Sequence, residues 1–139
     1  MIILDTDVLS EAMRDAPDPR FTAWFNGVPR LLVWTTAISL LEIRFGIERL
    51  PIGRRRTALV SAFESTVMDD LESRIIAFDA DAATKTATLM AERQRSGRPG
   101  DLRDSMIAGI AIAHRATLAT CNTRHFTDLP VPVVDPWTA

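Results

Sequence analysis

Three acidic residues stand where the surrounding sequence would turn them toward the interior of a fold. Asp5 ends a short apolar run, Glu42 lies inside an apolar stretch, and Asp104 begins a stripe of apolar residues at helical spacing. Carboxylates gathered in one place repel one another unless a cation offsets their charge, and oxygen ligands favour hard cations such as Mg²⁺ or Mn²⁺. We therefore predict that Asp5, Glu42 and Asp104 are metal ligands of a catalytic site, where the ion activates a water that attacks a phosphodiester.

Two further side chains are placed to join this site. Asn122 follows a predicted strand just as Asp5 does, so the two side chains meet if those strands are neighbours. Asp101 precedes Asp104 by three residues, which puts both acids on one side of a helix. One of them can cap the helix while the other binds the ion. We add Asn122 to the predicted catalytic residues and Asp101 to the additional candidate ligands.

Ordinary structural roles compete for each of these residues. Asp5 could cap the helix that follows it, and Asp104 could be a capping acid of the same kind. Glu42 could form a salt bridge with Arg49, two helical turns further on. Asn122 could be a turn residue. Proximity of the acids in space separates the two interpretations.

The composition fits one domain spanning residues 1–139. Hydrophobic residues make up 47% of the chain, so a core can form without disulfides. Cys121 is the only cysteine, and with two histidines in the chain a structural zinc site is also excluded. These features favour a reducing, cytoplasmic location. No basic leader opens the sequence and no apolar run approaches roughly 18 residues, so neither a signal peptide nor a membrane span is expected.

Short apolar runs alternate with longer stretches at helical spacing. Strands are predicted over residues 2–4, 31–34, 75–78, 117–120 and 131–134, and helices over 6–14, around Phe21, over 36–50, 55–71, from 79 or 81 to about 97, and over 103–114. Apolar runs without alternation indicate strands buried on both faces, hence a parallel sheet covered by helices. The predicted fold is a doubly wound α/β three-layer sandwich, with its ligand beyond the carboxyl ends of the strands where the strand order reverses.

Several motifs resemble those of PIN-domain proteins, in particular the VapC-like toxins of type II toxin–antitoxin pairs. The resemblance rests on LDTDVLSE at 4–11, SLLEIRFGI at 39–47, DSMIAGIA at 104–111, TCNTRHF at 120–126 and VVDPW at 133–137. The motifs follow in order over nearly the whole chain. The resemblance implies a five-stranded parallel sheet and hydrolysis of RNA with Mg²⁺ or Mn²⁺ held by Asp5, Glu42 and Asp104. It also implies inhibition by a small cognate antitoxin, a homodimer, and higher assemblies with the antitoxin on DNA.

Three positions depart from the pattern of that family. Asp7 stands where Asn or Ser is frequent, which adds a negative charge beside the metal and makes it a further candidate ligand. Asn122 occupies a place that is often Asp, which weakens any second metal site. His125 also stands where many relatives have Asp.

Arginine supplies 15 of the 16 basic residues. Arg98 and Arg103 lead toward the third acidic motif and are predicted to contact RNA, with Arg93 and Arg95 on the same approach. The densest basic cluster, 54–56, could bind phosphate but fits a solvated helix face better. The net charge of −2 argues against a protein that coats nucleic acid by charge alone.

Two other functions are compatible with parts of the sequence. Asp5 and Asp7 resemble the opening of haloacid-dehalogenase-like phosphatases, with Asp101 and Asp104 as a loose metal motif and Lys85 as the required lysine. The second acidic motif has no role in that alternative. The other alternative is a catalytically weak binding module that keeps the PIN fold and acts through its partner. The predicted function is a metal-dependent ribonuclease.

Overall fold

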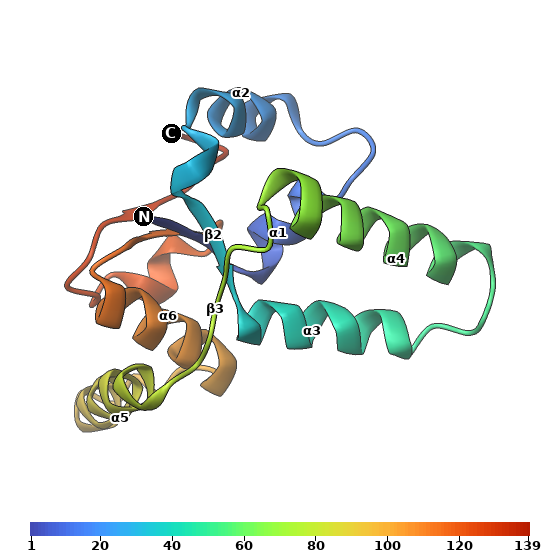
Figure 1. The fold of residues 1–139 in the computed structure, drawn as a ribbon. Coiled ribbons are helices and arrows are strands. Elements are labelled where there is room, and N and C mark those ends of the chain that lie inside the picture. Colours follow the sequence, from blue (N-terminus) through green and yellow to red (C-terminus); the bar gives the residue numbers. More distant parts are fainter.

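A five-stranded parallel sheet forms the centre of the computed structural model, which describes residues 1–139 (Figure 1). The strands are β1 (Ile2–Leu4), β2 (Val33–Thr36), β3 (Ile75–Ile76), β4 (Thr117–Ala119) and β5 (Val133–Val134). Their order in the sheet is β3-β2-β1-β4-β5, and every neighbouring pair is parallel. The chain builds outward from β1 to β3 and then returns to the other side through β4. The strand order therefore reverses between β1 and β4, as a doubly wound sheet requires.

Helices cover both faces of the sheet, so the predicted three-layer α/β sandwich is confirmed. They are α1 (Thr6–Ala12), α2 (Pro19–Gly27), α3 (Ala37–Glu48), α4 (Arg54–Ser65), α5 (Ala80–Arg95) and α6 (Leu102–His114), with short turns at Arg30–Leu32, Thr66–Asp70 and Thr123–Phe126. Figure 1 shows α3 and α4 running side by side away from the sheet, while α5 and α6 lie together against one face. No helix is both long and apolar enough to span a membrane.

Successive strand residues feed two separate cores. Ile3 and Leu118 belong to the core under α5 and α6, whereas Leu4 and Ala119 belong to the core under α1 to α4. All four side chains are fully buried. Because neighbouring residues of a strand point to opposite faces, both faces of β1 and β4 must be apolar. This is why β1 reads as a continuous apolar run.

Helices α5 and α6 pack with almost no space between them at Gly109. A Cβ atom at this position would lie 1.8 Å from Thr86 Oγ1 and 2.9 Å from the carbonyl oxygen of Ala82. The Thr86 hydroxyl donates to that same carbonyl at 2.7 Å. The close approach of the two helices therefore depends on the absence of a side chain at Gly109.

Some predicted boundaries are wrong, most clearly for the second strand. Leu31 lies in a 3₁₀ turn and is 71% exposed, so the strand begins only at Val33 and continues through Thr36. Arg74 holds this turn by donating from Nε to the Val33 carbonyl at 2.8 Å and from Nη2 to the Arg30 carbonyl at 2.6 Å. The predicted strands at 75–78 and 131–134 each shorten to two residues, and the helix predicted over 55–71 ends as α4 at Ser65, followed by a π turn.

Candidate active site

The carboxyl ends of β1 and β4 meet at the switch point, where the sheet geometry places a ligand. Asp5 directly follows β1, and its backbone N–H donates to the carbonyl of Ala119 at 3.0 Å. Thr120 directly follows β4 and is fully buried. Side chains from residues far apart in the sequence therefore emerge together at this edge.

Asp5 has a structural role and faces the site at the same time. It is the N-cap of α1, its Oδ1 accepting from the backbone N–H of Val8 at 2.9 Å, and it is only 6% exposed. The pKa of Asp5 is raised to about 6. Burial is the main cause and the charges of Asp7 and Asp104 add to it, while hydrogen bonds from Thr120 and Val8 act in the opposite direction. The carboxylate is therefore charged at neutral pH at a cost in stability.

Glu42 is held by a hydroxyl from the start of α1. Thr6 Oγ1 donates to Glu42 Oε1 at 2.8 Å. The other carboxylate oxygen, Oε2, lies 3.7 Å from Nη1 of Arg103. The alternative role of Glu42, an ion pair with Arg49, is not formed, because the Arg49 guanidinium lies over the ring of Phe45. Arg103, which is predicted to contact RNA, joins α6 to the acidic residue on α3.

Asp104 lies in the first turn of α6, beside the acid that caps the helix. Asp101 takes the capping role, since its Oδ1 accepts from the backbone N–H of Asp104 at 3.1 Å. The carboxylate of Asp104 remains free of hydrogen bonds. Burial and the charges of Asp101 and Glu42 raise the pKa of Asp104, whereas His125 lowers it.

Asn122 contacts Asp7 rather than Asp5. Its Nδ2 donates to Asp7 Oδ2 at 3.2 Å, and the thiol of Cys121 lies 3.8 Å from the same oxygen. The side chain of Asn122 was expected to meet Asp5, but it meets Asp7, two residues further along the chain. Burial and the charges of Asp7 and Asp5 raise the pKa of Cys121 to about 11, so this cysteine is a neutral thiol and a poor nucleophile at neutral pH.

These acids are close enough to interact, but they do not close around a single point. The charge of Asp104 raises the pKa of Asp5, and that of Glu42 raises the pKa of Asp104. No three Asp, Glu, His or Cys side chains lie close enough to enclose an ion directly. Mg²⁺ commonly takes one or two carboxylates and keeps several waters, so complete enclosure is unnecessary. The all-oxygen donor set, with Asp104 free, fits a hydrated Mg²⁺ or Mn²⁺.

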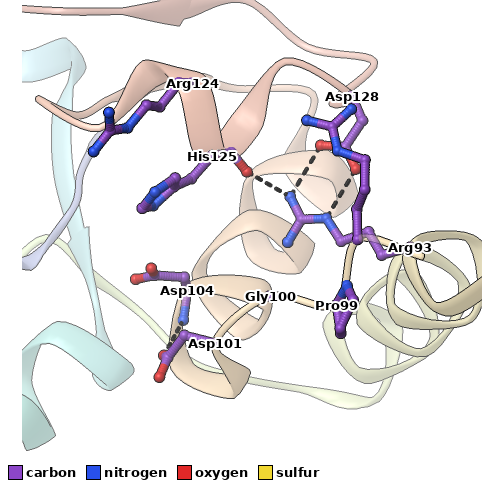
Figure 2. Close-up of a pocket in the computed structure, with 9 residues that line it drawn as sticks. Arg93, Pro99, Gly100, Asp101, Asp104, Arg124, His125 and Asp128 are labelled. Carbon is purple, nitrogen blue, oxygen red and sulfur yellow. Dashed lines mark hydrogen bonds and ion pairs between the residues drawn. The ribbon is translucent and has the colours of Figure 1, made fainter. Parts of the chain in front are cut away.

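Beside Asp104 lies a hollow of about 330 Å³ lined by nine residues, none of them hydrophobic (Figure 2). We refer to it as the arginine pocket. Arg98, predicted to contact RNA, lines it together with Arg124 and His125. Arg93 was expected to face the substrate, but it is 5% exposed and hydrogen-bonds Asp128, so its role in this structure is to hold the wall of the pocket.

Three contributors were missed from the sequence. Thr6 and Thr120 carry hydroxyls that hydrogen-bond acids of the site. Thr120 directly follows β4 and Thr6 comes two residues after the end of β1, positions near strand ends that could have marked them. Arg124 carried no signal of its own, because its place in the pocket depends on how the segment after β4 folds back.

The phosphatase alternative is not supported by the position of Lys85. This residue lines a different hollow, together with Arg115 and Ala113 near the end of α6. Asp104 lies nine residues before Ala113 on α6, which is about 13 Å along the helix axis. A lysine at that distance cannot serve a phosphate held by the acids.

Comparisons with known proteins give a consistent result. A family model described as PIN domain matches residues 2–131. A VapC ribonuclease of Sinorhizobium fredii is 36% identical over 137 residues, covering 99% of this chain and 98% of that protein. The similarity therefore extends over almost the full length of both chains.

Solved structures agree with the sequence comparison. The crystal structure of FitAcB from Neisseria gonorrhoeae has a TM-score of 0.89 and 32% identity, and covers 100% of each chain. A DNA-bound VapBC complex from Salmonella typhimurium has a TM-score of 0.78 and 28% identity, and covers 97% of each chain. The order of strands and helices described above is thus shared with these structures.

Proposed function

Because the chain belongs to the PIN-domain family, we propose that it is a metal-dependent endoribonuclease and the toxin of a type II toxin–antitoxin pair. The main support is that Asp5, Glu42 and Asp104 lie near one another at the switch point of the sheet. The charge of Asp104 raises the pKa of Asp5, the charge of Glu42 raises the pKa of Asp104, and Thr6, next to Asp5, hydrogen-bonds Glu42. The full-length similarity to a VapC ribonuclease supports the same reaction.

Asp5, Glu42 and Asp104 would hold Mg²⁺ or Mn²⁺ at this site. Such an ion lowers the pKa of a bound water and offsets charge that develops on the leaving oxygen. The residues of the chain supply orientation. Thr6 fixes the carboxylate of Glu42, and Asn122 fixes that of Asp7. Asp104 stays available at the positive end of α6.

We also propose an antitoxin partner, a homodimer in the cytoplasm, and a higher assembly on DNA. FitAcB and DNA-bound VapBC, to which the chain is similar over nearly its whole length, support the partner and the assembly. Exposed apolar residues on α3 support a protein interface.

The nuclease is tested with purified protein, Mn²⁺ or Mg²⁺, and end-labelled RNA. We expect cleavage by the unmutated chain, its loss on chelation, and a decrease of about a hundredfold or more in Asp5→Asn, Glu42→Gln and Asp104→Asn. Asp81→Asn, an exposed acid on α5, is the matched control and should cleave normally. Binding of RNA without cleavage by the unmutated protein would favour the binding module instead.

The toxin role is tested separately by expressing the chain alone in a bacterial host. Growth should stop with the unmutated chain and continue with Asp104→Asn at equal protein level. Normal growth with abundant folded, RNA-cleaving protein would refute the toxin role and leave the nuclease standing.

A further inference from the structure

The arginine pocket is built around a buried guanidinium. Arg93 donates from Nε and Nη2 to the two carboxylate oxygens of Asp128 at 2.8 and 3.0 Å, and from Nη2 to the carbonyl of His125 at 2.9 Å. Its Nη1 donates to Ser105 Oγ at 3.3 Å, and that hydroxyl donates to the carbonyl of Asp101 at 2.9 Å. One side chain therefore fixes both the segment after β4 and the start of α6.

The backbone on this wall is packed directly against the guanidinium. A Cβ atom at Gly100 would lie 2.9 Å from Arg93 Nη1, which is held in place by its hydrogen bonds. The backbone at Gly100 and the Arg93 guanidinium therefore form a wall of the pocket that has little freedom to move.

The arginines that line the pocket differ in whether a carboxylate is paired with them. Arg93 is neutralised by Asp128, whose pKa its hydrogen bond lowers. Arg98 and Arg124, by contrast, form no salt bridge and are exposed, although the charge of Arg98 also contributes to the lowered pKa of Asp128. Figure 2 shows Arg124 and His125 on one side of the hollow and Asp104 on the opposite side. Free cationic groups thus face the pocket directly beside an acid of the candidate active site.

We propose that the arginine pocket binds an RNA backbone phosphate adjacent to the one that is cleaved, contacted by Arg98, Arg124 and His125. This inference rests on the proposed nuclease function. None of the nine lining residues is hydrophobic, whereas arginine forks match the oxygens of a phosphate. A phosphate contact fixes the position of the strand and carries no sequence information. The pocket would therefore set how RNA enters the acidic site.

Binding of a labelled single-stranded RNA is measured in the Asp5→Asn background, which prevents cleavage, across a range of salt concentrations. Arg98→Gln and Arg124→Gln should each weaken binding about fivefold to tenfold and flatten the dependence of log K on log salt by about 0.7. Arg55→Gln, an exposed arginine on α4, is the matched control and should change both quantities little. Thermal unfolding verifies that each variant is folded.

Replacing one charged phosphate of the RNA with a neutral linkage tests which phosphate the pocket binds. In RNA with a methylphosphonate next to the mapped cleavage site, affinity should fall for the protein with both pocket arginines but not for Arg98→Gln/Arg124→Gln. If the chain cleaves RNA and these variants bind like Arg55→Gln, the subsite is wrong and the nuclease stands. If the unmutated chain neither binds nor cleaves RNA, both proposals fail. If the pocket variants keep their affinity for RNA but no longer bind the antitoxin, the pocket binds an acidic protein segment. That result would overturn the proposal.

Discussion

At the scale of single residues, Asp5 shows how position in the sheet sets a conflict between stability and chemistry. The end of β1 buries its carboxylate next to Asp7 and Asp104, which disfavours the charged form. The N-cap hydrogen bond from Val8 offsets part of this cost. The charge is therefore retained in the fold although a neutral side chain would suit it better.

Replacing Asp5 with Asn should stabilise the protein near pH 7.5 while abolishing activity. Asn also caps helices, and it removes a charge whose pKa is raised from 3.8 to about 6. A raised carboxyl pKa stabilises the fold below about pH 3.8, and this contribution is lost as the pH rises through 6. We expect Asp5→Asn to gain about 1–3 kcal/mol at pH 7.5 and much less at pH 4.5.

Urea unfolding of both proteins at the two pH values measures this difference. Asp81→Asn provides the control for loss of an exposed acid and should show no such pH dependence. A lower stability of Asp5→Asn at pH 7.5 would contradict the assigned cause of the raised pKa.

At the scale of elements, the contact between α5 and α6 carries Asp104 and Arg93 on the same rigid pair. Gly109 allows the two helices to approach until its Cα faces Thr86 and the backbone of Ala82. The start of α6 and the end of α5 are then held together by Arg93 through Ser105. Packing along the helices thus positions the third acid.

Gly109→Ala should destabilise the fold by about 1–3 kcal/mol or more, because the added methyl overlaps Thr86 Oγ1. Removing that hydroxyl in Gly109→Ala/Thr86→Ala should recover part of the loss. Thermal or urea unfolding of the single and double variants measures the coupling. Equal losses in the single and double variants would show that the limiting contacts are the Ala82 carbonyl and the Cβ atom retained at position 86, each 2.9 Å from the added methyl.

At the scale of the whole molecule, α3 leaves an apolar surface uncovered. Leu41 and Phe45 are each 55% exposed and lie one turn apart, flanking the acidic position Glu42. Side chains at this spacing lie on the same side of a helix, and contiguous exposed apolar groups are typical of protein interaction sites. The same helix thus carries an acid toward the site and apolar groups toward solvent.

Leu41→Ser/Phe45→Ser should convert the proposed homodimer into a monomer without loss of RNA cleavage. The reason is that burial of two large apolar side chains per chain contributes a substantial part of a small interface. Sedimentation velocity measures the mass of each protein, and Ile52→Ser, in the exposed turn after α3, is the control. A dimer that persists in the double variant would place the interface elsewhere.

The fold could be predicted because burial on both faces leaves a direct mark on composition. The run 2–4 is apolar at every position and the run 117–119 at two of its three, and helices of regular spacing separate them. The predicted boundaries of the elements were wrong where apolar residues are exposed, as at Leu31. They were also wrong where a side chain remote in sequence, such as Arg74, holds a turn. Composition carries no information about either circumstance.

The candidate site was only partly predictable for a related reason. Asp5 and Asp104 were identified from their places at a strand end and a helix start, which are local features. The ion pair of Glu42 with Arg103 and the burial of Arg93 depend on packing between elements remote in sequence. Local spacing therefore suggested only Arg49 as an alternative partner and gave no sign of the one supplied by α6.

The buried guanidinium of Arg93 has a consequence for how such chains can change over generations. Without Asp128 it would be a buried charge that lacks its carboxylate partner, and without Arg93 the carbonyl of His125 and the Ser105 hydroxyl would lose their donor. Lysine cannot replace the planar guanidinium of Arg93, because its ammonium group is a single point of charge and cannot bind both oxygens of Asp128 in the same geometry. Inherited substitutions at 93 and 128 should therefore occur as a pair, and neither should be tolerated alone.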